Sequence, residues 1–293
     1  MFSKGLKHMF LAGLFFSFMN LGVKFLPNMP TLQIVFFRAL LMFCITLWYL
    51  KRNKINPLGN NRKVLFLRGF FGVIALSCYF YSLQNMPFAS AVTIMQLSPI
   101  FTTLAAIFIL KEKIKPIQLL FFLISFIGVI FIKGFDPRIS VKLLLIALAG
   151  SIISALAYNM IRKVKDTDHP MVVVFYFPLV AVPITGVATA FNFVMPTLNQ
   201  WFILFVIGIC TQFAQINMTK ALQMERIAKV SIVRYLTIVY AIIYSYLFFE
   251  ETYNIYTYVG MMLVVVGIVM NLLFTNRDEK KAKFLAKKNP NNE

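Results

Sequence analysis

Two arginines lie deep inside apolar stretches of the sequence. Arg38 is about seven residues from the nearer end of its stretch, roughly 10 Å along a helix, and Arg234 lies about as deep in a later one. Neither has an acidic residue three or four positions away. A guanidinium offers a fixed charge and paired donors that suit a carboxylate or phosphate. These arginines could therefore line a cavity and bind an anionic substrate group. Alternatively, each snorkels to the nearer end of its helix or bonds backbone carbonyls.

Acidic and imidazole groups are placed differently from these arginines. All ten acidic residues lie between apolar stretches, at their ends or in the C-terminal tail, and His8 and His169 stand where stretches begin. Cys44, Cys78 and Cys210 lie inside apolar stretches and read as small core residues. No nucleophile–base pair, metal cluster or Gly-rich loop ending in Lys-Ser/Thr appears at depth. The sequence therefore predicts no enzyme, no catalytic residue, no metal and no cofactor.

Other polar and aromatic residues on the apolar stretches are weaker candidates for a cavity lining. Hydrogen bonds between helices are the alternative use for each of them. Gln212 and Gln215 are three positions apart and would share a helix face. Prolines inside the stretches loosen a helix and are candidate hinges or static kinks. The candidate lining residues are Asn20, Tyr79, Tyr81, Gln96, Asn159, Tyr176, Gln212, Gln215, Asn217 and Tyr235, and the candidate hinges are Pro99, Pro178 and Pro183.

The composition requires a membrane to hold these residues. The 293 residues are 60% hydrophobic, with a mean hydropathy of +0.78, which a soluble domain of this size could not bury. The apolar stretches are continuous, which excludes a transmembrane β-barrel, and each holds roughly 20 residues, enough to cross a bilayer as a helix. The sequence predicts ten spans: Leu6–Leu26, Thr31–Leu50, Val64–Asn85, Pro87–Leu110, Lys115–Lys133, Val141–Ile161, Pro170–Phe191, Leu198–Lys220, Ile227–Phe249 and Thr252–Phe274.

The distribution of basic residues predicts an orientation. With the N-terminus in the cytoplasm and ten alternating spans, all but six of the 29 basic residues are counted in cytoplasmic segments, Arg68 among them, as the positive-inside rule requires. We therefore expect a multi-pass protein of the cell membrane, of the inner membrane if bacterial, with both termini cytoplasmic. The net charge of +19 then serves topology and anionic lipid heads and needs no nucleic acid. Residues 276–293 are expected to form a basic, disordered cytoplasmic tail.

An internal repeat organises the spans. A shift of 139 residues places Ser82–Ile130 over Ala221–Val269 without a gap, pairing Glu112 with Glu251 and Gly128 with Gly267. Residues 1–134 and 135–275 would then be two five-helix repeats. Because five is odd, the second repeat enters the membrane from the opposite side, as in many secondary transporters. The expected fold is an all-α membrane protein of ten helices in two inverted repeats.

The residues of the second to fourth spans resemble the EamA-type family of drug/metabolite transporters. The likeness rests on Phe36-Phe37-Arg38-Ala39-Leu40 and on the block from Tyr81-Ser82-Leu83-Gln84-Asn85-Met86-Pro87 through Ser98-Pro99 to Lys111-Glu112-Lys113. Ile238 departs from it, because the family often repeats the proline of Pro99 there. The resemblance implies a ten-helix carrier with its cavity between spans one to four and six to nine. Family members move amino acids, nucleotide-linked sugars, S-adenosylmethionine and drugs.

The expected function is a secondary transporter that moves a small metabolite by alternating access. The cargo would be anionic or zwitterionic, such as an amino acid, a nucleotide-like molecule or a molecule like S-adenosylmethionine. The lack of a mid-membrane acid favours exchange or facilitated diffusion over proton coupling. The alternative is a non-transporting membrane scaffold or receptor. Expected partners are the substrate and a bilayer with anionic lipids, with a homodimer left open.

Overall fold

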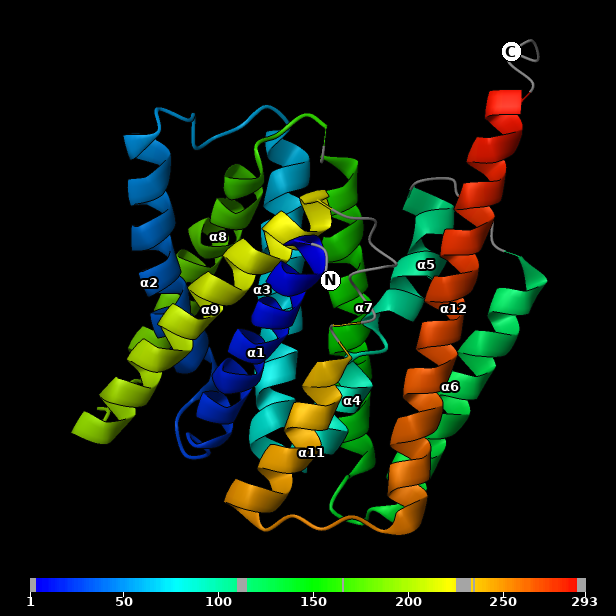
Figure 1. The fold of residues 1–293 in the computed structure, drawn as a ribbon. Coiled ribbons are helices and arrows are strands. Elements are labelled where there is room, and N and C mark those ends of the chain that lie inside the picture. Colours follow the sequence, from blue (N-terminus) through cyan, green and yellow to red (C-terminus); the bar gives the residue numbers. More distant parts are fainter. Residues whose placement is uncertain (1–3, 110–114, 165, 225–232, 234, 289–293) are drawn as a thin grey trace.

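The computed structural model describes residues 4–109, 115–164, 166–224, 233 and 235–288, and within these residues every regular element is a helix. The helices pack side by side with their axes roughly along one direction (Figure 1). In chain order they are α1 (Lys4–Lys24), α2 (Thr31–Arg52), α3 (Arg62–Asn85), α4 (Phe88–Met95), α5 (Ser98–Ile109), α6 (Pro116–Phe135), α7 (Val141–Lys163), α8 (Pro170–Phe191), α9 (Leu198–Met224), α11 (Leu236–Phe249) and α12 (Ile255–Lys288).

The described helices are long and apolar enough for a multi-pass membrane protein. Nine candidate spans meet both criteria within the described residues, with α4 and α5 counted as one span, Phe88–Ile109. The shorter apolar helix α11 is the described part of the predicted span Ile227–Phe249, whose first residues lie outside the described ranges. Large apolar side chains such as Phe108, Phe191 and Phe202 are strongly exposed, as side chains that contact lipid must be. The count agrees with the ten predicted spans.

Several helix starts follow from local chemistry. Pro116 and Pro170 occupy first turns, where a missing backbone N–H costs nothing. Ser140 caps α7 by accepting a hydrogen bond from the Leu143 backbone N–H at 3.2 Å. The predicted starts at Thr31, Val141, Pro170 and Leu198 are therefore confirmed.

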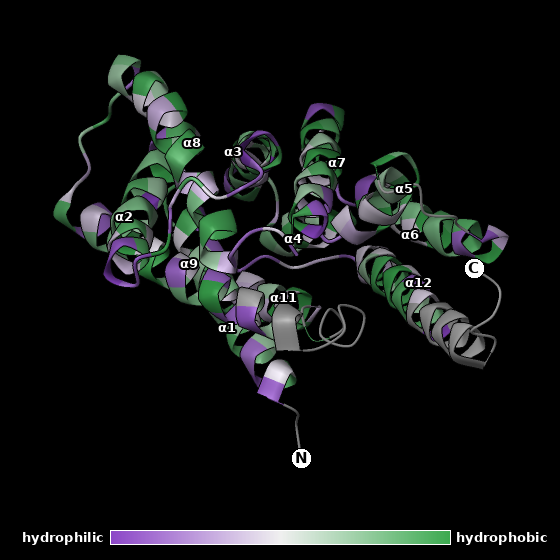
Figure 2. Ribbon diagram, turned by 90° about the horizontal axis from the view of Figure 1, so that it is seen from above, coloured by the Kyte–Doolittle hydropathy of each residue, from purple (hydrophilic) through white to green (hydrophobic). Residues whose placement is uncertain are grey.

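The helices pack mainly in pairs that join the first half of the chain to the second. α1 packs on α9, α3 on α7, α2 on α8, α4 on α11 and α6 on α12. Seen along the bundle, α2 and α8 lie at one edge and α6 and α12 at the opposite edge, with the other helices between them (Figure 2). α1 begins and α12 ends toward the same end of the bundle as the connection 53–61 and the described part of the connection between α7 and α8 (Figure 1). We call this the basic end, and the end with connections 25–30, 136–140 and 250–254 the far end.

Glycines bring the backbones of α6 and α12 into contact. A Cβ atom added at Gly128 would lie 2.6 Å from the Gly260 carbonyl oxygen, and one added at Gly260 would lie 2.7 Å from the Gly128 carbonyl oxygen. A Cβ atom added at Gly267 would lie 2.6 Å from the Phe121 carbonyl oxygen. Small residues that let backbones approach in this way are typical of helix pairs in membranes. The α6–α12 pair is therefore tightly joined.

Prolines affect the fourth and seventh spans differently. The fourth span breaks at Gln96–Leu97, and α5 begins at Ser98 with Pro99 in its first turn, because proline cannot donate to the preceding turn. α8 runs without interruption through Pro178 and Pro183. The backbone loosening predicted at Pro99 is confirmed, whereas the hinge role of all three prolines stays a prediction.

The last helix is longer than the sequence suggested. α12 continues to Lys288, so much of the segment 276–293, which was predicted to be disordered, is helical. Residues 275–288 include five lysines together with Glu279, Ala282 and Ala286, all good helix formers. The helix therefore extends beyond the apolar span.

Candidate functional site

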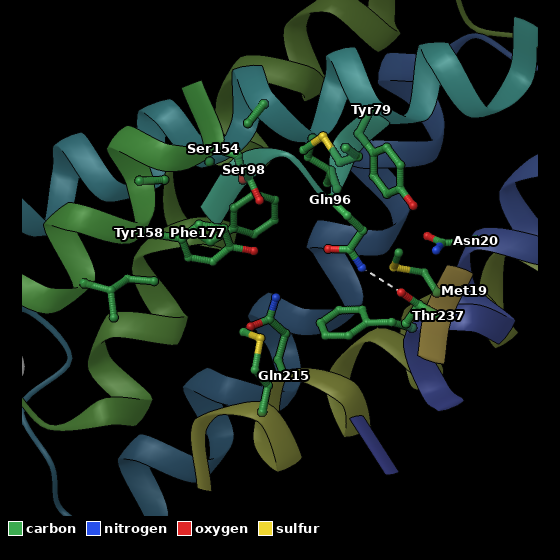
Figure 3. A pocket seen from close by; sticks show the side chains of 18 of the residues that line it. Met19, Asn20, Tyr79, Gln96, Ser98, Ser154, Tyr158, Phe177, Gln215 and Thr237 are labelled. Atoms are coloured by element: carbon green, nitrogen blue, oxygen red, sulfur yellow. Dashed lines mark hydrogen bonds between the residues drawn. The ribbon is translucent and has the colours of Figure 1, made fainter. Parts of the chain in front are cut away.

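A cavity of about 170 Å³ lies inside the bundle. We call it the central cavity. Its wall comes from α1, α2, α3, α4, α5, α7, α8, α9 and α11, and includes Gln96 at the end of α4. In Figure 3, Tyr158 and Phe177 lie on one side of the cavity, and Asn20, Tyr79 and Thr237 on the other. Five of the predicted lining residues are here: Asn20, Arg38, Tyr79, Gln96 and Gln215.

Arg38 reaches the cavity from α2 and is only 3% exposed. Its Nε donates a hydrogen bond to the Thr211 hydroxyl at 2.9 Å. Its guanidinium carbon lies 5.1 Å from the centre of the Phe177 ring and 5.7 Å from that of Phe80. Nη1 has no hydrogen-bond partner among the described residues. Arg38 therefore points inward and does not snorkel to a helix end.

Arg68 is a cavity residue that the sequence interpretation placed wrongly. It was counted among the charges of a cytoplasmic connection, but it lies in the second turn of α3 and is 7% exposed. Its guanidinium carbon lies 5.6 Å from the centre of the Phe177 ring. One indication was available, because Arg68 lies inside the predicted span Val64–Asn85, although only four residues from its start. What hides it from water is α8, which packs against α3 and places Phe177 beside it.

Neutral polar groups occupy the part of the cavity nearer the far end. The Gln96 amide nitrogen donates to the Thr237 hydroxyl at 2.6 Å, a bond that links the end of α4 to α11 (Figure 3). Asn20 from α1 lies beside this bond in the same view. Its Oδ1 is buried and has no partner among the described residues. This wall can therefore offer hydrogen bonds without charge.

The other predicted lining residues that the structure describes are not in the cavity wall. Asn159 donates to the carbonyls of Thr102 and Ala155, at 3.0 and 3.1 Å. The Tyr176 hydroxyl donates to the Leu58 carbonyl at 2.8 Å, near the basic end. The Asn217 side-chain oxygen is hydrogen-bonded to the His8 ring at 2.7 Å. Gln212 and Tyr235 are buried, and Tyr81 is half-buried, all outside the wall. Arg234 lies outside the described residues.

A polar cluster joins three helices at the far end of the bundle. The Lys24 ammonium lies 3.3 Å from Oε1 of Glu251 and also donates to the Met86 carbonyl. Oε2 of Glu251 accepts from the Phe88 backbone N–H at 2.7 Å, and from Ser245 at 3.0 Å. Glu251 therefore ties together the ends of α1 and α11 and the start of α4. We call this the Lys24–Glu251 cluster.

Tyr253 completes this cluster from the connection between α11 and α12. Burial, together with the nearby Glu251 carboxylate, raises the pKa of the Tyr253 phenol. The phenol therefore keeps its proton and donates it to Oε2 of Glu251 at 2.8 Å. In turn it accepts a hydrogen bond from the Ala89 backbone N–H at 3.1 Å. The cluster thus supplies partners to two N–H groups in the first turn of α4, which would otherwise lack them.

The central cavity has a wall of mixed chemistry. Its wall combines two guanidinium groups with neutral amides, hydroxyls and aromatic rings. Within the part of the chain that the structure describes, no group of three His, Cys, Asp or Glu side chains is placed to hold a metal ion. Such a wall can recognise a small solute by charge and hydrogen bonds.

Comparison with known proteins decides the family. The model of the EamA-like transporter family matches residues 3–134 and, a second time, residues 141–273. The chain belongs to the EamA-like transporter family. The resemblance seen in the sequence is thereby confirmed, and this EamA-like protein is a multi-pass membrane protein of a transporter family.

Named relatives agree with this assignment. The EamA-like chain is 29% identical over 262 residues to the pseudopaline exporter CntI of Pseudomonas aeruginosa, covering 88% of this chain and 92% of that protein. It is 30% identical to human solute carrier family 35 member G1, covering 90% and 78%. It is 25% identical to the S-adenosylmethionine uptake transporter of Rickettsia bellii, covering 87% of each. A solved crystal structure with 18% identity shares the fold, with a TM-score of 0.66 over 95% of this chain and 100% of that one.

Proposed function

We propose that this EamA-like protein is a secondary transporter that moves a small metabolite through the central cavity by alternating access of two inverted halves. The observation that carries the proposal is the pairing of helices across the halves. The repeat relates α1 to α7 and α3 to α9. If each helix is replaced by its counterpart in the other repeat, the α1–α9 pair becomes the α7–α3 pair, and both pairs are in contact. The same replacement leaves the α2–α8 and α6–α12 pairs unchanged, because each consists of two counterparts. Two similar halves of opposite orientation can swap shapes and so expose a shared site to each side.

Side chains in the cavity region follow the same repeat. The shift of 139 residues relates Asn20 to Asn159 and Lys24 to Lys163. Both asparagines are buried, and each has an Oδ1 atom without a partner among the described residues. The shift also relates Glu251 to Glu112, which lies outside the described ranges. These matches support two repeats with residues 1–134 and 135–275 as their bounds.

We assign the described conformation to one state of such a cycle. The wall of the central cavity extends from Asn20 and Tyr79, within two turns of the far end, to Arg68 and Ile161, within two turns of the basic end. At the far end the Lys24–Glu251 cluster holds α1, α4 and α11 together, and we infer that it closes the cavity there. With the basic end in the cytoplasm, as its lysines and arginines favour, this state faces inward and both termini are cytoplasmic.

The cargo class follows from the charges of the wall. Arg38 faces the cavity with an unused donor, which favours a substrate with a negative group, such as an amino acid, a nucleotide-like molecule or a molecule like S-adenosylmethionine. No Asp, Glu or His side chain lines the cavity among the described residues. Exchange or facilitated diffusion therefore fits this wall better than proton coupling.

Counterflow into proteoliposomes tests the proposal. A melting-temperature screen of purified protein against amino acids, nucleotides and S-adenosylmethionine selects a ligand. Vesicles loaded with that ligand should take up its labelled form from outside, and an imposed pH gradient should leave the rate unchanged. Empty vesicles are the control. Binding without any flux would favour the scaffold or receptor alternative, and strong acceleration by protons would exclude simple exchange.

A further inference from the structure

Arg38 and Arg68 come from different helices and converge on one aromatic ring. Their guanidinium carbons lie 5.1 and 5.6 Å from the centre of Phe177 on α8. Gly72 makes room for this arrangement, because a Cβ atom there would lie 3.0 Å from the Phe177 ring and 3.6 Å from Nη1 of Arg68. The two charges are close enough to repel each other. Three helices thus hold two like charges together in the wall of the central cavity.

The two guanidinium groups have more donors than the protein uses. Nη1 of Arg38 and both Nε and Nη1 of Arg68 are buried and have no hydrogen-bond partner among the described residues. Asp136, Asp168 and Glu251 have other partners, namely Arg138, the Asn60 backbone and Lys24. Burying a charged group without a partner costs several kcal/mol, so such groups are normally paired. Within the described ranges no acidic side chain pairs with either guanidinium, which leaves their charges to be matched by a bound molecule.

Resting on the proposed transport function, we propose that Arg38 and Arg68 form a single site for a doubly charged anionic end of the substrate, either a phosphate monoester or a pair of carboxylates. Two positive charges and three unused N–H donors match the charge and the several acceptor oxygens of such a group. The rest of the substrate then faces the neutral wall at Asn20 and Gln96.

Binding of small probes to the purified protein tests the site without requiring flux. At pH 7.5 and low salt, phenyl phosphate and glutarate carry two charges, whereas benzoate and butyrate carry one and benzyl alcohol carries none. The melting temperature should rise with phenyl phosphate, glutarate or both, and at least tenfold higher concentrations of benzoate or butyrate should be needed for the same rise. The choice between the two dianions identifies the phosphate or the dicarboxylate. Equal effects of the singly charged or neutral probes would overturn the proposal.

Variants assign the effect to the two arginines. Arg38→Gln and Arg68→Gln should each weaken binding of the preferred dianion at least tenfold. Arg52→Gln is the matched control, because Arg52 also stacks on an aromatic ring, with its guanidinium carbon 5.1 Å from Trp48, but is exposed. It should bind as the unmodified protein does. Loss of binding in all three variants, or in neither cavity variant, would contradict the site.

The stability of the ligand-free variants separates a binding role from a structural one. If Arg68 has no charged partner until the substrate binds, Arg68→Gln removes an unpaired buried charge. The ligand-free variant should then melt at the same temperature as the unmodified protein or at a higher one. A large fall in melting temperature would mean that Arg68 serves the fold instead. Binding of the dianion without counterflow would contradict the proposed transport function but support this anion site. Counterflow of neutral solutes alone would support transport but contradict the anion site.

Discussion

Lys24 is the last residue of α1, and its ammonium nitrogen lies 3.3 Å from the carboxylate of Glu251, which follows α11. The two side chains are each 13% exposed, so the pair is neither a surface contact nor a fully dry one. It joins helices from the two halves of the chain at the far end of the bundle. In the proposed transport cycle, opening of the cavity at that end requires this contact to break.

Lys24→Met should therefore favour the state that is open at the far end. Loss of a partly buried ion pair worth about 1 kcal/mol shifts a two-state equilibrium roughly fivefold. In a background without Cys44, Cys78 and Cys210, a cysteine at Met19 should react about five times faster with a maleimide reagent that cannot cross the membrane, added outside intact cells. Lys142→Met is the control, because Lys142 is an exposed lysine at the start of α7, on the same end. Equal labelling of the two variants would show that the pair does not hold this end closed.

Thr211→Val should weaken substrate binding through Arg38. The variant removes the hydroxyl that accepts the 2.9 Å hydrogen bond from Arg38 Nε and leaves that donor unsatisfied. A hydrogen bond to a charged group contributes about 1.5–3 kcal/mol, so the KM for counterflow should rise roughly tenfold or more with little change in kcat. Thr211→Ser keeps the hydroxyl and should restore the KM. If valine and serine behave alike, the hydrogen bond does not position Arg38.

Gly128→Ala should destabilise the protein without touching the cavity. The new methyl group would lie 2.6 Å from the Gly260 carbonyl oxygen and 2.8 Å from the Val264 nitrogen, backbone atoms that cannot rotate away. Overpacking of this kind costs about 1–3 kcal/mol, which a lower melting temperature in detergent should report. Gly134→Ala, in the same helix with no heavy atom within 4 Å, should be neutral or slightly stabilising. A Gly128 variant as stable as the Gly134 variant would mean that the helices separate at little cost.

Two glutamines should separate transport from stability. Gln96→Leu breaks the 2.6 Å bond to Thr237 in the cavity wall, and Gln118→Leu breaks the 2.9 Å bond to Asn271 between α6 and α12. We expect Gln96→Leu to lower kcat/KM for counterflow about tenfold, the effect of roughly 1.4 kcal/mol of lost interaction. Gln118→Leu should lower the melting temperature and leave transport per folded molecule within about twofold. If Gln118→Leu lowered transport and Gln96→Leu lowered only the melting temperature, the polar contacts that matter for transport would lie outside the cavity.

The sequence predicted the spans because lipid contact imposes length and apolarity on each of them, whatever their neighbours. The start of α2 at Thr31 and the end of α3 at Asn85 could be predicted to the residue. The break beside Pro99 also follows from local chemistry. The extension of α12 could not be read from hydropathy, because that segment is polar and its helix depends on intrinsic propensity.

The site was only partly predictable, because a polar residue in a span reveals its depth but not its neighbours. Gln96 and Asn159 are both polar residues inside spans, yet one lines the cavity and the other bonds two backbone carbonyls. Arg68 was missed because its depth is ambiguous near a helix start. Its burial depends on Phe177, more than 100 positions away in the sequence, and no local pattern reports such a contact.

The contact of Gly128 with Gly260 has a mechanical consequence. Where two backbones touch, sliding one helix past the other loses contact at once, so this line is a stiff connection between the halves. It runs along one edge of the bundle, and α2 and α8 form the opposite edge (Figure 2). If the halves rotate about this line, α6 and α12 lie on the rotation axis and move least. Displacements would grow across the molecule, and α2, which carries Arg38, would travel farthest.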